Sequence, residues 1–254
     1  MTVTLDAARI LDPALALGWP AVLAFVRIGA MMALLPVLSE VVVPARVRLA
    51  LALALTPVVA PFAATAAPDP HPAALVAEAA AGLALGAVLR LMLQALQMAG
   101  AMIAQATSLA QMFPGSGPEP LPAIGHLLTV AGLALFVALD GPVRAVQLLL
   151  LSYEAMPPGA LPQPADLAMW LLDRSGLAIA LAFQLAAPFL AASLMYTVAL
   201  GVMNRAMPSL MLTLVGAPAQ AAGMLVLTLA VLPLALGLWR GGLEAALDAP
   251  LAVR

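Results

Sequence analysis

The length of the uninterrupted apolar stretches is the feature that most limits what this chain can fold into. Several of them reach the roughly 20 residues that a helix needs to cross a lipid bilayer. The stretches are Ala14–Leu38, Val47–Ala64, Ala73–Phe113, Leu121–Leu151, Leu167–Met203 and Ser209–Trp239. We therefore predict an all-α integral membrane protein, built from multiple hydrophobic helices.

Composition supports this prediction. The chain is 65% hydrophobic and 9% charged, whereas soluble domains have about 45–50% apolar and about 25% charged residues. The net charge is −2 and no basic tail is present, so nucleic-acid binding has no electrostatic support. We expect a lipid membrane as the surroundings and one polytopic membrane domain over residues 1–254.

One stretch is too long for a simple crossing. Ala73–Phe113 is about twice the length of an ordinary span. We predict either two helical segments or one helix that projects well beyond the membrane. Pro188 and Pro233 fall inside other apolar stretches and are expected to kink them.

The loop that follows this long stretch is rich in glycine and proline. Met112 and Phe113 lead into Pro114, Gly115, Ser116, Gly117 and Pro118. These residues cannot continue a helix and leave backbone polar groups unpaired. Such a backbone must lie in water, inside protein or along a cavity. With its apolar Met–Phe pair, the loop is predicted to be a plug, gate or contact loop.

The helix before the loop has one unusual face. Spacings of four and three residues place amides, a hydroxyl, a small residue and thioethers on the same side. These residues are Gln94, Met98, Ala101, Gln105, Ser108 and Met112. Small and polar residues often mediate helix packing in membranes. The alternative is a face that looks towards a pore or a partner chain.

Charged residues within the apolar stretches are few and expected to have partners. They are Arg27, Glu78, Arg90, Asp140, Arg144, Asp173 and Arg174. Asp140 and Arg144 are four residues apart and could form a structural ion pair. A stand-alone small-solute transporter is an alternative function, in which Asp140 or Glu78 would be essential.

Enzymatic signatures are weak. His71 and His126 are the only histidines, lie far apart and are accompanied by no cysteine, so we expect no metal site and no cofactor. Ser116 with His126 as base would resemble an intramembrane serine protease. The flanking Pro114 and Pro118 suit an exposed loop better, and we predict that the chain is not an enzyme.

Several ordered segments, spread over about residues 15–240, resemble one family. The first are Phe25-Val26-Arg27-Ile28-Gly29 with Pro36, and Val43-Pro44-Ala45-Arg46-Val47-Arg48. The next are Glu78, Gly82 and Gly86, then Gln97-Met98-Ala99-Gly100 and Gln105. The last are Phe136 with Asp140-Gly141, Leu200 to Pro208 including Arg205, and Gly216-Ala217-Pro218. Together they resemble the FliR family of flagellar export-gate proteins and its injectisome counterpart.

The resemblance implies a structural, channel-forming subunit of the flagellar type III protein export gate, in which the hydrophobic helices form helical hairpins. Such a subunit would sit in the bacterial inner membrane, in the flagellar basal body, and serve flagellum assembly. Implied partners are FliP, FliQ, FlhB and FlhA in a hetero-oligomer, with unfolded export substrates passing through. The family's channel-closing loop corresponds here to Met112, Phe113 and the residues up to Pro120. Pro142 departs from the family pattern, and the injectisome version stays an alternative.

Overall fold

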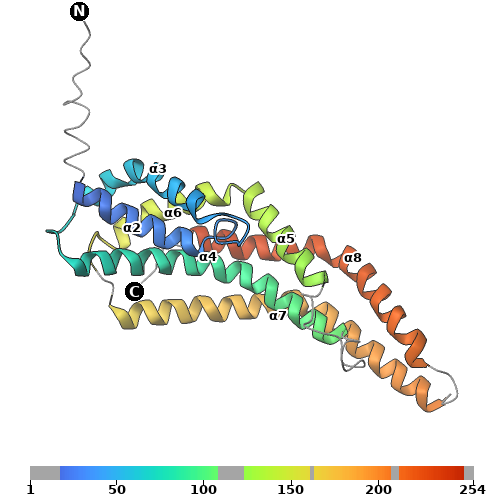
Figure 1. Cartoon of the computed structure of the whole chain (residues 1–254). Coiled ribbons are helices and arrows are strands. Elements are labelled where there is room, and N and C mark those ends of the chain that lie inside the picture. The colour runs from blue at the N-terminus through green and yellow to red at the C-terminus, as the bar shows by residue number, and fades with distance from the viewer. Residues whose placement is uncertain (1–17, 108–122, 161–162, 207–211, 249–254) are drawn as a thin grey trace, which may run out of the picture. The chain divides into compact units, whose positions relative to one another are not determined.

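The computed structural model describes residues 18–107, 123–160, 163–206 and 212–248, and in these ranges the chain is helical without strands. The helices are α2 (Gly18–Leu34), α3 (Ala45–Ala64), α4 (Pro72–Thr107), α5 (Ala123–Ala138), α6 (Gly141–Ala155), α7 (Pro164–Ala206) and α8 (Leu212–Asp248) (Figure 1).

The lengths of these helices fit a membrane protein. Within the described ranges, α3, α4, α7 and α8 contain segments that are long and apolar enough to cross a bilayer. The pair α5 and α6 adds a fifth candidate if the two form one broken span. The predicted all-helical membrane architecture is therefore confirmed.

The long stretch that begins at Ala73 forms one helix rather than two. α4 has 36 residues, which at 1.5 Å per residue is about 54 Å of helix. The hydrocarbon core of a bilayer is only about 30 Å thick. The second of the two predicted alternatives, a helix longer than the membrane, is the one observed.

The stretch Leu121–Leu151 is interrupted instead. Asp140 has φ 55°, in the left-handed region, and Pro142 follows at the start of α6. A left-handed residue cannot continue a right-handed helix, so α5 ends at Ala138 and α6 begins at Gly141. Proline alone does not end the other helices, because α7 continues through Pro188 and α8 through Pro233.

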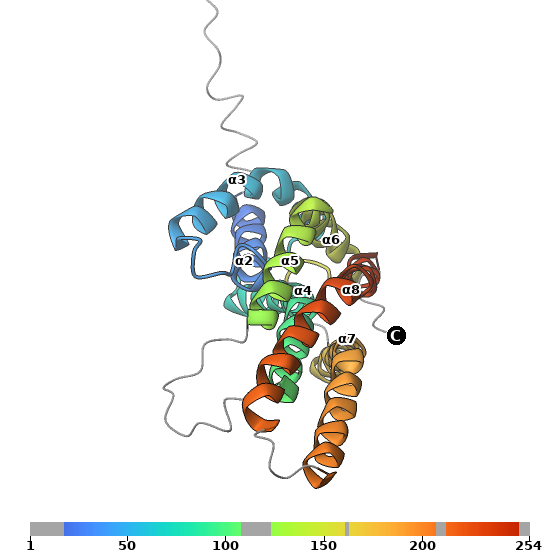
Figure 2. The ribbon, with the colours of Figure 1, turned by 90° about the vertical axis from the view of Figure 1, so that its right-hand side faces the viewer.

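The described residues form two compact units. Unit 1 draws on Met1–Arg90, Asp140–Arg174 and Ala245–Arg254, and unit 2 on Leu91–Leu139 and Ser175–Glu244. In unit 1, α2 and α3 pack side by side (Figures 1 and 2). Apolar residues of α2, α3 and α6 meet around one small cavity, among them Ile28, Val59 and Leu149.

Unit 2 is held by close backbone packing and by a buried tryptophan that is hydrogen-bonded to a neighbouring helix. Gly100 of α4 faces Gly125 of α5 so closely that a side chain on Gly100 would overlap the Gly125 backbone. Trp239 of α8 is 1% exposed, and its indole Nε1 donates a hydrogen bond of 2.7 Å to the carbonyl of Met92 in α4.

Candidate functional site

A buried arginine lies at the centre of unit 1. Arg27 of α2 and Glu78 of α4 are both 0% exposed. The arginine Nε donates to Glu78 Oε2 at 2.6 Å, and Nη2 donates to Oε1 at 3.1 Å. This bidentate geometry is the strong form of an arginine–carboxylate contact.

The end of α6 supplies further partners for the guanidinium. Nη1 of Arg27 donates to Ser152 Oγ at 3.0 Å, and Nη2 donates to the carbonyl of Met156 at 3.0 Å. The ring of Tyr153 lies against the cation, with its centroid 3.9 Å from Cζ. Stacking on an aromatic face adds to the stabilisation of a desolvated arginine.

The carboxylate also has a backbone partner. The N–H of Gly159 donates to Glu78 Oε1 at 2.8 Å. Gly159 has φ +69°, and a side chain there would crowd Pro68 and Ala74. The turn after α6 is thereby fixed to the start of α4. We call the set Arg27, Glu78, Ser152, Tyr153, Met156 and Gly159 the arginine cluster.

Two predicted glycines bring α4 close enough to α2 for this cluster to form. A side chain at Gly82 would overlap the Arg27 carbonyl, and one at Gly86 would come within 2.6 Å of the Met31 carbonyl. Small residues allow helix backbones to approach this closely. Gly82 and Gly86 are thus contacts within the chain.

Charges in apolar stretches were expected to have partners, and Arg27, Glu78 and Arg90 do. The contact between Arg27 and Glu78 was not predicted from the sequence. Ser152, Tyr153 and Gly159 were not predicted to take part in the site. The only available signal was the presence of opposite charges on two apolar helices, which does not specify which pair meets.

The predicted polar face of α4 lies on the surface of unit 2. Gln94, Ala101 and Gln105 are exposed and Met98 is half-buried. Ser108 lies outside the described residues, as do the predicted plug residues Met112, Phe113, Pro114, Gly115, Ser116 and Gly117. The described residues of the chain leave Gln94, Ala101 and Gln105 exposed, so packing among the described helices does not explain these three positions.

The other family positions are spread over both units. Asp140 is exposed at the start of α6, where its carbonyl accepts a hydrogen bond of 2.9 Å from the Arg144 N–H. Pro36, Gly100 and Gly141 are buried, whereas Pro44, Arg46 and Arg205 are exposed. Pro208 lies outside the described residues.

Nothing in the described ranges assembles these residues into a catalytic site. His126 is exposed on α5, and Ser116, its predicted partner, is not described. Within the same ranges, no group of three or more metal-ligating side chains comes together. The arginine cluster joins three helices and leaves no reactive group open to solvent.

Known proteins resemble the chain over most of its length. Residues 19–246 match the family described as bacterial export proteins, family 1. The flagellar biosynthetic protein FliR of Caulobacter vibrioides is 31% identical over 206 residues, which covers 78% of this chain and 82% of the relative. The FliR protein of Pectobacterium carotovorum is 29% identical, covering 79% and 77%. That of Escherichia coli is 28% identical, covering 85% and 84%. The predicted resemblance is confirmed: the chain belongs to bacterial export protein family 1, with FliR proteins as its relatives.

Proposed function

We propose that this chain is the structural, channel-forming subunit of a flagellar type III protein export gate, in the bacterial inner membrane and the basal body. The observation that carries the proposal is the extent of the match. The family covers residues 19–246, and three relatives named as flagellar FliR proteins align over 77% or more of their own lengths.

The exposed apolar surface of α3 and α8 supports a role as one subunit of a larger assembly. In the candidate spans of α3 and α8, only 22% of the most apolar window is buried within the chain. Surface of this kind must be covered by lipid or by other proteins. We assign part of this cover to FliP, FliQ, FlhB and FlhA, which completes a hetero-oligomer around the channel.

The polar face of α4 is the part that we assign to the channel. Gln94, Met98 and Gln105 lie at exposed or half-buried positions, and an unfolded export substrate passing through water favours such a lining over a purely apolar one. Ser108 continues this face, and the loop from Met112 to Gly117 would close it. A hydrophobic constriction can seal a pore because water leaves it readily.

The transporter alternative is disfavoured by the arginine cluster. Glu78 was one of the two residues on which solute uptake would depend, the other being Asp140. The two oxygens of Glu78 accept hydrogen bonds from Arg27 and Gly159. A carboxylate that is 0% exposed and bound in this way has little capacity to bind a solute. The injectisome alternative is disfavoured because the three relatives carry flagellar names.

The test is removal of the gene, followed by complementation with the intact chain. We expect loss of motility and of hook and filament proteins from the medium, with both restored by complementation. An affinity-tagged chain is expected to purify with FliP and FliQ. Normal export in the deletion strain, or purification of the chain as a solitary, well-behaved transporter, would overturn the proposal.

A further inference from the structure

The last turn of α4 is bonded to two other helices of unit 2. α4 ends at Thr107, so the carbonyl of Ala106 is one of the last four, which lack a partner within their own helix. The hydroxyl of Ser193 in α7 donates a hydrogen bond to this carbonyl. Gln220 of α8 donates from Nε2 to the same carbonyl at 3.2 Å and to Ser193 Oγ at 3.1 Å. We call Ser193, Gln220 and the Ala106 carbonyl the α4 clamp.

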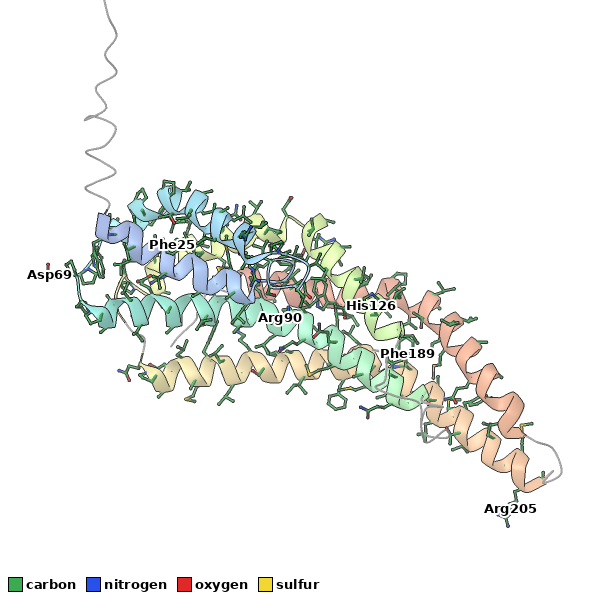
Figure 3. All side chains as sticks on the ribbon, viewed as in Figure 1. Phe25, Asp69, Arg90, His126, Phe189 and Arg205 are labelled. Carbon is green, nitrogen blue, oxygen red and sulfur yellow. The ribbon has the colours of Figure 1, made fainter. Side chains whose placement is uncertain are left out.

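Hydrogen bonds, more than packing, hold the amide of this clamp. Gln220 lines a cavity of about 370 Å³ between α7 and α8, and side chains beside a cavity have fewer atoms in contact. Ser193 is 5% exposed, and Phe189, one turn before it on α7, is also buried (Figure 3). A hydroxyl that is buried among apolar residues needs a hydrogen-bond partner, and the Ala106 carbonyl supplies it.

The α4 clamp acts on the side of α4 that lies opposite to its polar face. Ile103 is 0% exposed, whereas Gln105 is exposed. With 3.6 residues per turn, Gln105 lies about 200° from Ile103 around the helix axis, and Ala106 lies only about 60° from it. Ala106 is therefore on the buried side. Because the clamp holds this side, it fixes the rotation of the last turn and the direction of Gln105.

We propose that the α4 clamp sets the direction in which the last turn of α4 presents Gln105 to the channel. Ser193 and Gln220 are positioning residues, which act on a passing substrate only through the backbone of α4. Helix ends open readily when their terminal carbonyls lack partners, and an opened turn would let Gln105 turn away. These roles rest on the proposed channel function of α4, because the two residues hold the proposed lining in place.

The test uses the full chain in cells that carry its partner subunits, and it depends on the absence of cysteine from the chain. Gln105→Cys, or separately Gln94→Cys, is combined with an export substrate that has one cysteine in its unfolded part and a tightly folded domain that stalls it. A bismaleimide reagent joins the two cysteines, and immunoblotting measures the yield. Ser193→Ala or Gln220→Glu should lower the yield at position 105 about threefold or more, the effect of one lost hydrogen bond on an equilibrium. Position 94, about three turns earlier on α4, is the internal control and should keep its yield.

Two further variants separate positioning from a general loss of stability. Gln220→Glu removes both donors of the amide, whereas Gln220→Lys keeps a donor and should preserve the yield at position 105. Thr228→Val removes a hydroxyl that is 4% exposed and donates within α8, to the Met224 carbonyl at 2.7 Å. This substitution should also leave the yield unchanged.

An unchanged yield at position 105 in both Ser193→Ala and Gln220→Glu would overturn the proposal. An equal fall at positions 94 and 105 would also overturn it, because folding or assembly would then be lost instead of the direction of one turn. If neither position is cross-linked before any substitution in the clamp, the channel role of α4 is refuted together with the role of the clamp. That result is distinguishable from failure of the clamp alone, in which both positions are cross-linked and the clamp substitutions have no effect.

Discussion

Replacing Arg27 with methionine is expected to destabilise the protein by about 3–5 kcal/mol, the usual cost of removing one member of a buried ion pair. The guanidinium makes four hydrogen bonds, two of them to Glu78. After the substitution, Glu78 would keep only the Gly159 N–H among the donors observed in the described part of the chain. Its buried carboxylate would then lack most of the compensation for lost hydration.

The assay is denaturant unfolding of the purified chain in detergent, followed by tryptophan fluorescence. Arg27→Met, Glu78→Leu and the double variant form a thermodynamic cycle. Each single substitution should cost several kcal/mol, and the double variant should cost clearly less than their sum. A coupling energy of about 2–3 kcal/mol is expected, at the upper end for residues in direct contact.

Arg90→Met is the matched control. Arg90 also forms an ion pair, but its side chain is 26% exposed and that of Glu40 is 29% exposed. Water screens such pairs, so the expected cost is about 1 kcal/mol or less. The reasoning is refuted if Arg27→Met costs no more than Arg90→Met, or if the two single substitutions at Arg27 and Glu78 are additive.

Two further substitutions test the close packing of each unit, with unfolding midpoints as the readout. Gly82→Ala should cost about 1–3 kcal/mol because the added Cβ would overlap the carbonyl of Arg27. Gly29→Ala is the control: a Cβ at Gly29 would have no neighbouring atom within 4 Å, so the substitution should be neutral or slightly stabilising. Equal effects of the two substitutions would contradict this reasoning. Trp239→Phe should cost about 1–3 kcal/mol through its lost hydrogen bond and smaller ring. Trp170→Phe should cost less, since the Trp170 Nε1 has no hydrogen-bond partner in the described ranges. A larger loss of stability from Trp170→Phe than from Trp239→Phe would contradict a stabilising role for the Trp239 hydrogen bond.

The helices could be predicted because their signal is local. Apolar residues in long runs leave the backbone no partner but itself in a membrane, so the positions of α3, α4, α7 and α8 follow closely from the stretches in the sequence. The break at Asp140 was not predicted, because Leu121–Leu151 is apolar on both sides of it. A single left-handed residue ended the helix there.

The candidate site was predicted only in part. Gly82 and Gly86 were identified only as part of the family resemblance, and the helix that they contact depends on the surface that α2 presents. Met112 and its neighbours were predicted to close a channel, and that remains a prediction because they lie outside the described residues.

By itself, the sequence determined the class of the protein and its helices, because hydrophobicity and proline act through neighbouring residues. Only the tertiary structure decided that Arg27 pairs with Glu78 and that Ser152 and Gly159 complete their hydrogen bonds. These residues are far apart in the chain, and any of the charges could have found another partner. The close approach of α2 and α4 at Gly82 selects this one, because desolvated charges are tolerated only where nearly all their hydrogen bonds are made.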